Sequence, residues 1–251
     1  MVAPPTEAGT TSYRFDGEAL RPRAGGGDVD AQAERIHAAL RAVVLDPQYP
    51  CLGARSVMQE QSYWFSMYDR LAEPASTAAL ATDLAAFVRE RDALEGRFAS
   101  FIAVFGAPKV RTELQFERHL WRQLRMLHAA DVSPWDATVS SDPGAPDFSF
   151  SFAGCAFFVV GLSPANERWA RSFPWPLLVF NAHDQFERLR EEGRFERMSG
   201  IIRERDAEVE GEANPNLEHF GTHTEARQYA GREVPDDWRC PVTFRRRGAG
   251  R

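Results

Sequence analysis

Residues 148–160, Phe148-Ser-Phe-Ser-Phe-Ala-Gly-Cys-Ala-Phe-Phe-Val-Val160, decide how this chain folds. The first five residues alternate between phenylalanine and serine, and this period of two is typical of a half-buried β-strand. The run that begins at Cys155 is almost entirely apolar, as in a strand that is buried on both faces. Ala153 and Gly154 separate the two runs, and a two-residue connection that contains glycine favours a hairpin turn. The stretch therefore predicts a β-hairpin with a buried second strand.

Helical and strand-like patterns lie on both sides of this hairpin. Apolar residues recur at helical spacing over residues 31–45, 76–94, 112–130 and 184–190, and short apolar runs predict strands at 98–105 and 176–181. The strands come close together and in hairpins, without a regular alternation of strand and helix. This order favours an α+β fold, with an antiparallel or mixed sheet packed by helices, over a doubly wound parallel sheet.

We expect one folded domain over residues 28–244. Residues 1–27 contain Pro-Pro, Thr-Thr and Gly-Gly-Gly with few apolar side chains, which predicts a mobile tail. Residues 245–251, Arg-Arg-Arg-Gly-Ala-Gly-Arg, form a short basic tail. Residues 49–56, Tyr-Pro-Cys-Leu-Gly-Ala-Arg-Ser, are expected to be a loop.

The composition limits the partners and the compartment. The chain of 251 residues carries 30 basic and 36 acidic side chains, a formal charge of −6, which gives no general electrostatic basis for binding nucleic acid. Its apolar stretches are shorter than the roughly 18–20 residues that cross a bilayer, so no membrane partner is expected. The start of the sequence is not typical of a signal peptide. Three cysteines without paired spacing favour a reducing compartment, and we expect a cytoplasmic protein.

Several common motifs are absent from the sequence. It contains no G-x-G-x-x-G, no G-x-x-x-x-G-K-[ST], no C-x-x-C and no G-x-S-x-G. This disfavours Rossmann dinucleotide binding, Walker-type use of ATP, ribbon-type zinc sites and α/β-hydrolase chemistry.

His128 is a candidate ligand for heme iron. It lies seven residues after Trp121 and four after Leu124, on the apolar side of the helix predicted over residues 112–130. A helix that presents an imidazole from an aromatic wall is a common way to bind heme. The alternative is structural, because a histidine near the C-terminus of a helix is favoured by the helix dipole.

Cys51 is the second candidate ligand. A cysteine thiolate can bind heme iron, or act as a nucleophile if a base lies close by. The alternative is that Cys51 is a small buried apolar residue, which is the common case for cysteine. Arg168 and Arg171 follow the buried strand and could neutralise carboxylates, although they could equally be ordinary surface cations.

Other histidines offer further possibilities. His219 and His223 are four residues apart and could clamp a metal ion if the segment were helical, but Gly221 interrupts it and a solvated loop is the alternative. His183 lies where a predicted strand gives way to a predicted helix. Such positions often face a cleft, although the polar residues beside it could simply cap the helix.

A succession of sequence strings resembles the YqcI/YcgG family. These strings are Tyr-Pro-Cys-Leu-Gly-Ala-Arg-Ser at 49–56, the Leu-Trp to Leu-His-Ala-Ala-Asp helix at 120–131, Asp-Pro at 142–143 leading into 150–164, Arg168 to Arg171, Pro-Trp-Pro at 174–176, Leu-Val-Phe-Asn at 178–181, His-Asp-Gln-Phe at 183–186 and Glu-Ala-Arg-Gln-Tyr at 225–229. They occur in order over roughly residues 45–230, which is most of the folded part.

The resemblance implies an activity and a cofactor. Members with an assigned role are similar to heme-dependent N-oxygenases, which hydroxylate a guanidino or amino nitrogen in natural-product pathways. For this chain the resemblance implies heme b, dioxygen and a small nitrogenous substrate such as an arginine-like molecule. Because no flavin or nicotinamide motif is present, the electrons are expected to come from a separate donor.

The resemblance also suggests roles for individual residues. His128, in a Leu-His-x-x-Asp string, becomes the first choice for axial ligand, and Cys51, in a Pro-Cys string, the second. The other cofactor contacts implied are Arg55 and Arg171, toward propionate or substrate carboxylate, and Trp121 beside His128. The acids that could hold a substrate cation are Asp131, Asp184 and Glu225. The alternatives to an oxygenase are a non-catalytic heme carrier or sensor, and a metal enzyme built on His219 and His223.

Overall fold

A seven-stranded mixed β-sheet runs through the computed structural model, which describes residues 12–23, 28–216 and 223–245. The strands are β1 (Ser12–Phe15), β2 (Leu20–Pro22), β3 (Tyr63–Arg70), β4 (Ser100–Ala107), β5 (Phe150–Phe152), β6 (Cys155–Leu162) and β7 (Leu177–Ala182). Over these residues they lie in the order β2-β1-β3-β4-β7-β6-β5. Strands β3 and β4 are parallel, and the other neighbouring pairs are antiparallel. The predicted α+β fold with a mixed sheet is confirmed.

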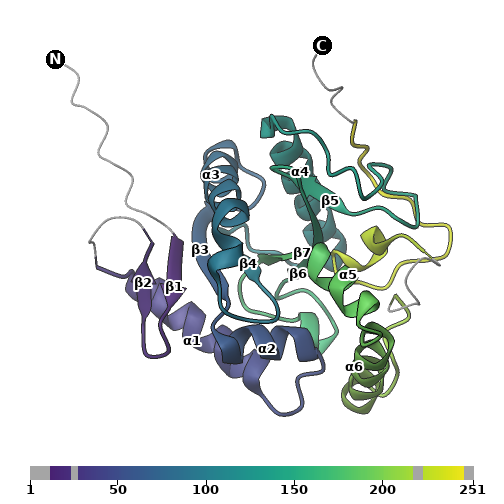
Figure 1. Ribbon diagram of the computed structural model, residues 1–251, viewed down its shortest axis with the longest axis horizontal. Helices are drawn as coiled ribbons and strands as arrows, with labels where there is room; N and C mark the ends of the chain where they lie inside the picture. Colours follow the sequence, from purple (N-terminus) through teal and green to yellow (C-terminus); the bar gives the residue numbers. More distant parts are fainter. Residues whose placement is uncertain (1–11, 24–27, 217–222, 246–251) are drawn as a thin grey trace.

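Helices cover both faces of this sheet (Figure 1). They are α1 (Ala31–Leu45), α2 (Leu52–Glu60), α3 (Pro74–Glu90), α4 (Glu113–Ala130), α5 (Asp184–Glu191) and α6 (Phe195–Glu210), with the 3-10 helices η1 (Arg91–Ala93), η2 (Trp169–Arg171) and η3 (Glu225–Gln228). None of the helices in the described ranges has both the length and the apolar character needed to cross a membrane.

The pleat of the strands divides the core into two layers. Phe101, Phe157 and Phe180 point to the face covered by α3 and α4, which we call the α3–α4 face. Ile102 and Leu177 point to the opposite face, covered by α1 and α2, which we call the α1–α2 face. This division follows from the strand geometry, since successive side chains of a strand alternate between the two faces of a sheet. A residue on one face is therefore separated from the other face by the sheet itself.

The predicted hairpin is formed by β5 and β6. Phe152 pairs with Cys155, and the connecting residues Ala153 and Gly154 have φ angles of 54° and 76°. Positive φ at both central positions is the signature of the type I′ turn that suits a two-residue hairpin. Asp131, which caps the end of α4, accepts a hydrogen bond from the backbone N–H of Ala153 at 2.8 Å. As predicted, β6 is buried on both faces over most of its length.

The N-terminal segment differs from the prediction. Residues 12–22 form β1 and β2, and β1 pairs with β3 at the edge of the sheet, with Tyr13 and Leu20 buried. The prediction of a mobile tail over residues 1–27 is wrong for this part, because two very short strands show no clear period and gain their order from pairing, β2 with β1 and β1 with β3. Residues 1–11 and 24–27 lie outside the described ranges, as do residues 246–251 of the predicted basic tail.

The prediction of a loop over residues 49–56 is wrong from Leu52 onward. Helix α2 begins at Leu52, and Cys51 is its N-cap, with the sulfur accepting a hydrogen bond from the backbone N–H of Ala54 at 3.5 Å. Pro50 and Gly53 are typical of loops, and cysteine is not among the usual capping residues, so the sequence does not indicate this helix start.

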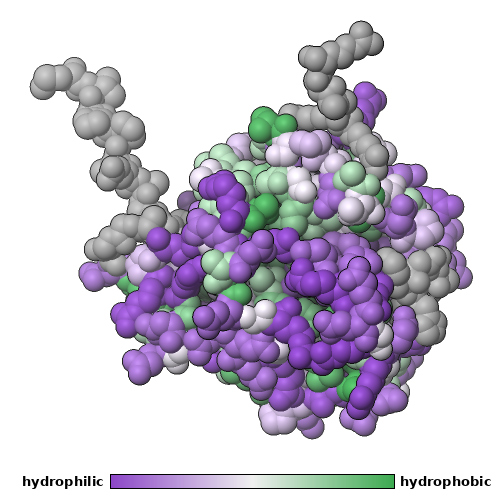
Figure 2. Space-filling model, in the orientation of Figure 1, coloured by the Kyte–Doolittle hydropathy of each residue, from purple (hydrophilic) through white to green (hydrophobic). Residues whose placement is uncertain are grey.

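The outer surface is largely hydrophilic in the view of Figure 2. In this view the hydrophobic residues gather in the upper half of the molecule, in the region of α3, α4 and β5. Large apolar side chains among the described residues are otherwise mostly buried, with Leu114, Val132 and Val209 as exposed exceptions. Scattered exposed apolar residues are normal on a protein surface and need no functional explanation.

Close packing at Gly161 in β6 allows a stability prediction. A Cβ atom there would lie 2.8 Å from the Tyr229 carbonyl oxygen and 2.7 Å from Phe116. We expect Gly161→Ala to lower the free energy of unfolding by about 1–3 kcal/mol, because backbone and core must shift. Gly200→Ala in α6 is the control, since its Cβ meets nothing within 4 Å, and it should stabilise the helix by up to about 1 kcal/mol. Urea unfolding of both variants tests this, and equal effects would contradict it.

Candidate functional site

A cavity of about 280 Å³ lies on the α1–α2 face of the sheet. Its floor is made of apolar side chains from β4, β6 and β7, including Ile102, Val160 and Val179, and its walls include residues of α1, α2, α5 and α6. The volume lies close to the lower end of the range of about 300–1,000 Å³ that is typical of small-molecule sites. Such sites are mostly apolar with a few polar groups that orient the ligand. The polar groups of this cavity form two sets, one around Cys51 and one around Glu225.

Cys51 lines the cavity at the N-terminus of α2. Burial raises the pKa of its thiol, while the nearby Arg171 and the hydrogen bond from the Ala54 N–H oppose that rise. A helix N-terminus and a guanidinium both stabilise a thiolate once it forms. This end of the cavity can therefore hold the sulfur as an anionic ligand.

Arg171 and Arg168 bring positive charge to the same cavity. Arg171 follows β6 in the η2 segment and donates a hydrogen bond to the Gly161 carbonyl oxygen at 3.2 Å. Arg168 forms an ion pair with the buried Asp206 at 2.7 Å, so part of its charge is already balanced. Within the described part of the chain, Arg171 forms no ion pair with a carboxylate, and a carboxylate of a ligand would complement it.

Glu225 supplies a buried carboxyl group to another part of the cavity. Its Oε1 atom accepts hydrogen bonds from Ser149 at 2.7 Å and from the Tyr229 hydroxyl at 2.5 Å. Burial raises the pKa of Glu225 to about 8, although these two hydrogen bonds and the charge of Arg190 oppose the rise. A pKa of about 8 favours the protonated acid at pH 7, and a bound cation would favour its ionised form.

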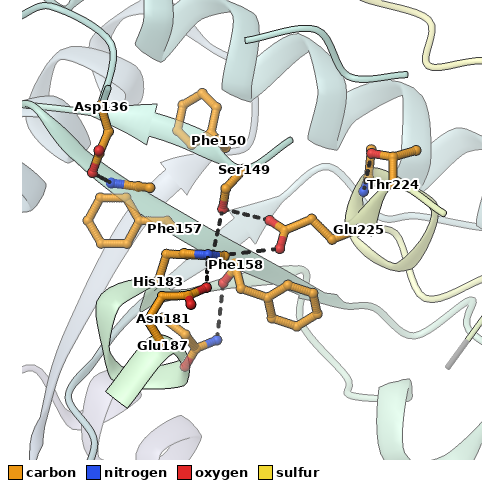
Figure 3. Close-up of polar contacts among 12 residues, drawn as sticks. Asp136, Ser149, Phe150, Phe157, Phe158, Asn181, His183, Glu187, Thr224 and Glu225 are labelled. Carbon is orange, nitrogen blue, oxygen red and sulfur yellow. Dashed lines mark hydrogen bonds and ion pairs between the residues drawn. The ribbon is translucent and has the colours of Figure 1, made fainter. Parts of the chain in front are cut away.

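His183 joins Glu225 to the first turn of α5 (Figure 3). Its Nδ1 atom lies 3.4 Å from the Ser149 hydroxyl and 3.9 Å from Glu225 Oε2, and its Nε2 atom lies 2.9 Å from Glu187 Oε1. Burial lowers the pKa of His183, and Glu187 opposes this. Burial thus favours the neutral imidazole, which lies between two carboxyl groups.

The Ser149–His183–Glu187 contacts share the order of a Ser-His-acid triad but do not favour its chemistry. Ser149 is fully buried, is not part of the cavity lining and donates its hydrogen bond to Glu225. A nucleophilic serine has to reach a substrate carbonyl, with its proton directed toward the histidine. The arrangement is therefore better suited to holding and moving protons than to acyl transfer.

The three predicted acids have different positions. Glu225 lines the cavity, whereas Asp131 and Asp184 do not. Asp131 accepts hydrogen bonds from the backbone N–H groups of Ser133 and Ala153, and so joins α4 to the hairpin turn. Asp184 binds both Nη atoms of Arg91 at 2.8 Å. Their hydrogen bonds give both aspartates structural roles, and among these three acids the cavity favours Glu225 for a substrate cation.

His128 and Trp121 lie on the other side of the sheet from the cavity. His128 packs edge-on against Trp135 and Phe244, with ring centroids 5.5 and 5.4 Å apart, on the α3–α4 face. Trp121 is buried on the same face and stacks on Tyr229. Neither residue lines the cavity. Their predicted roles toward heme stay predictions, and the structure brings neither of them together with Cys51 and Arg171.

The remaining candidates are more distant from the cavity. Arg55 donates hydrogen bonds to the carbonyl oxygens of Asp46 and Pro47 and is not in the lining. His219 lies outside the described residues, so the predicted pair with His223 is not placed. Among the residues that are described, no group of three or more His, Cys, Asp and Glu side chains is arranged to hold a metal ion.

The sequence did not indicate Ser149 and Tyr229 as site residues. Ser149 follows the strand alternation of residues 148–152 and looks like an outward-facing polar residue. Its buried position depends on the segment that contains η3. Tyr229, the residue after η3, accepts a hydrogen bond from the Gly161 N–H at its carbonyl oxygen, at 2.7 Å. The segment therefore lies beside the part of β6 that extends beyond β5. This contact joins residues far apart in the chain, and local pattern cannot show it.

Comparisons with known proteins find relatives that match most of this chain in sequence. The chain is 27% identical over 207 residues to "Uncharacterized protein YcgG" of Bacillus subtilis (strain 168), covering 78% of this chain and 81% of that protein. It is 27% identical over 184 residues to "Uncharacterized protein YqcI" of the same organism, covering 69% and 71%. It is also 27% identical over 217 residues to "Putative N(omega)-hydroxy-L-arginine synthase DcsA" of Streptomyces lavendulae, covering 80% of each chain.

No solved structure matches the chain. A family model described as "YqcI/YcgG family" matches residues 40–243, which include the whole cavity floor, Cys51 and Glu225. This chain belongs to the YqcI/YcgG family.

Proposed function

We propose that this protein N-hydroxylates the guanidino group of arginine or a closely related cation, with heme b bound in the cavity. The relative from Streptomyces lavendulae, which is named "Putative N(omega)-hydroxy-L-arginine synthase DcsA", supports the reaction type. The observation that carries the proposal is the pairing of a thiol-and-arginine end with a buried carboxyl in one apolar cavity. This combination suits an oxygenase site, because an apolar wall excludes water while a few polar groups orient the substrate.

The polar groups of the cavity match those that hold a heme, and the helical walls would have to move apart to admit the macrocycle into a volume of about 280 Å³. Cys51 offers a sulfur ligand at a helix N-terminus, and Arg171 and Arg168 offer cations for the propionate groups. When bound, a heme with a thiolate ligand supplies the activation of dioxygen, with electrons from a separate donor. We therefore propose Cys51, in place of His128, as the axial ligand, because Cys51 lines the cavity and His128 lies on the opposite face of the sheet.

The cavity residues also determine how a substrate would be held. Glu225 would ionise and pair with the guanidinium, and its carboxylate is already oriented by the hydroxyl groups of Ser149 and Tyr229. A second cation at the cavity wall, Arg190, lies close enough to lower the pKa of Glu225. The apolar side chains of the floor would contact the methylene chain of the substrate. The substrate nitrogen is thus positioned by the protein before any oxygen chemistry begins.

The reaction itself is the direct test. The heme-loaded protein, supplied with arginine, dioxygen and a chemical reductant, should form Nω-hydroxyarginine that carries one oxygen atom from isotopically labelled dioxygen. Two electrons and two protons are consumed, and one water is released for each hydroxylated nitrogen. Citrulline, which has no guanidinium, is the control substrate and should not react. Loaded protein that reduces dioxygen but returns arginine unchanged would contradict the proposal and favour a heme carrier or sensor.

A further inference from the structure

We propose that Glu225, Ser149, His183 and Glu187 form a proton-transfer path between the cavity wall and the solvent. The path rests on the proposed function at its inner end, since the reaction consumes protons inside a cavity from which a bound substrate excludes water. Its residues come from η3, the segment before β5, and helix α5. Figure 3 shows their side chains converging on His183.

The inner end of the path is the Glu225 carboxyl group. Its Oε1 atom is occupied by the hydrogen bonds from Ser149 and Tyr229, so the proton of the neutral acid belongs on Oε2. Glu225 Oε2 lies 3.9 Å from His183 Nδ1, and a closure of about 1 Å would bring the two atoms to ordinary hydrogen-bond distance. The Ser149 hydroxyl, 2.7 Å from Oε1 and 3.4 Å from Nδ1, bridges the same gap.

The outer end of the path is Glu187. Its Oε1 atom lies 2.9 Å from His183 Nε2, and its side chain is 46% exposed, whereas that of Glu225 is 9% exposed. Burial therefore increases from Glu187 to Glu225, and His183 connects the solvent-exposed carboxylate to the buried one. An imidazole can accept a proton at one nitrogen and release one from the other, which suits this position.

The charges around His183 come from several elements. Glu187 and Arg190 face it from its own helix α5, Glu225 from η3, and Asp136 from the loop that follows α4. Arg190 also pairs with Glu187, which helps to hold that carboxylate in place. The histidine thus has carboxyl groups on both sides and a cation that restrains the outer one.

The proton steps balance without any transfer of electrons. Moving outward, the Oε2–H group of Glu225 passes its proton to His183 Nδ1 as the two atoms approach, while Ser149 keeps its hydrogen bond to Oε1, and the proton on Nε2 passes to Glu187 and on to water. The reverse sequence brings a proton from solvent to the cavity. Each step breaks one O–H or N–H bond and forms another. Glu225 becomes a carboxylate when it loses its proton, and Glu187 becomes neutral until it releases its proton to water.

Arginine binding provides a measurement that needs no turnover. If a guanidinium ionises Glu225, the full-length protein should release a proton as it binds arginine, and a pH-indicator dye in a stopped-flow instrument at pH 6.5 records the rate. Because His183 lines the cavity, each protein is measured at saturating arginine, and in His183→Gln we expect the same amplitude of proton release but a rate at least about tenfold lower. Glu187→Gln should slow release in the same sense. Glu191→Gln, an equal charge change at an exposed position of α5, is the matched control and should have no effect.

The outcomes separate the path from the proposed function. Slow release in His183→Gln and Glu187→Gln, with normal release in Glu191→Gln, supports the path. Release at the wild-type rate in His183→Gln shows that protons leave through the cavity mouth, and overturns the path while leaving the proposed function intact. No release from the wild-type protein overturns the path together with the substrate pairing at Glu225. Because Glu187 is half-exposed, its variant keeps the test valid if His183→Gln folds poorly.

Discussion

Replacing Cys51 by serine is expected to abolish tight heme binding, while replacing His128 by alanine should leave it unchanged. Serine is a preferred N-cap residue, so Cys51→Ser keeps the start of α2 and removes only the sulfur ligand. Loss of an iron ligand should lower the heme affinity by more than the roughly 10- to 100-fold that is typical when a residue hydrogen-bonded to a metal ligand is replaced. Hemin titration followed by the Soret band measures this, and the spectrum of the reduced carbon monoxide complex distinguishes thiolate from imidazole ligation.

Cys240→Ser is the matched control for this experiment. Cys240 is partly exposed like Cys51, but it packs near the α3–α4 face and does not line the cavity. Its substitution should leave heme affinity and spectrum as in the wild type. The opposite pattern, with His128→Ala colourless and Cys51→Ser fully loaded, would return the ligand role to His128 and place the heme on the α3–α4 face.

The sequence predicted the elements that carry strong local signals. Helix α4 was predicted over residues 112–130 because Thr112 is a good cap and the apolar residues recur at helical spacing, and the structure confirms Thr112 as the N-cap. The β5–β6 hairpin was predicted from a two-residue turn between a half-buried and a fully buried strand. In both cases the residues that specify the element are neighbours in the chain.

Elements that depend on distant partners were missed. Strands β1 and β2 contain three or four residues each; β2 pairs with β1, and β1 in turn pairs with β3, some fifty residues later. Helix α6 was not predicted, because it carries many charges and buries few residues, so its sequence has no clear apolar stripe. Propensity and period are weak signals where tertiary contacts supply most of the order.

The residues of the candidate site also differ in how far the sequence could predict them. Cys51, Arg171 and Glu225 were expected from the family resemblance, and the structure brings all three to one cavity. His128 was favoured because a histidine on an apolar helical stripe is a plausible ligand, but periodicity cannot tell which face of the sheet its helix covers. That choice depends on the handedness and order of the connections, which are properties of the whole fold.

Glu225→Gln is expected to weaken arginine binding by about 30-fold or more, since loss of one partner from a buried charge pair costs about 2 kcal/mol or more. Glutamine has the same shape and can still accept hydrogen bonds from Ser149 and Tyr229, so the cavity should keep its structure. Isothermal titration calorimetry measures the affinity. Equal affinity in the variant and the wild type would remove Glu225 from the substrate site.

The pH dependence of binding gives the second half of this prediction. The pKa of Glu225 is raised to about 8 in the empty protein, so below that pH the acid must lose a proton before it can pair with a guanidinium. Arginine affinity should therefore rise about tenfold per pH unit between pH 6 and 7.5 and level off above pH 8. In Glu225→Gln the affinity should not change over this range, and the neutral ligand citrulline should show no such rise with either protein. A wild-type affinity that is flat from pH 6 to 8 would mean that Glu225 is already ionised in the empty cavity, or does not contact the cation, and either result contradicts the proposed pairing.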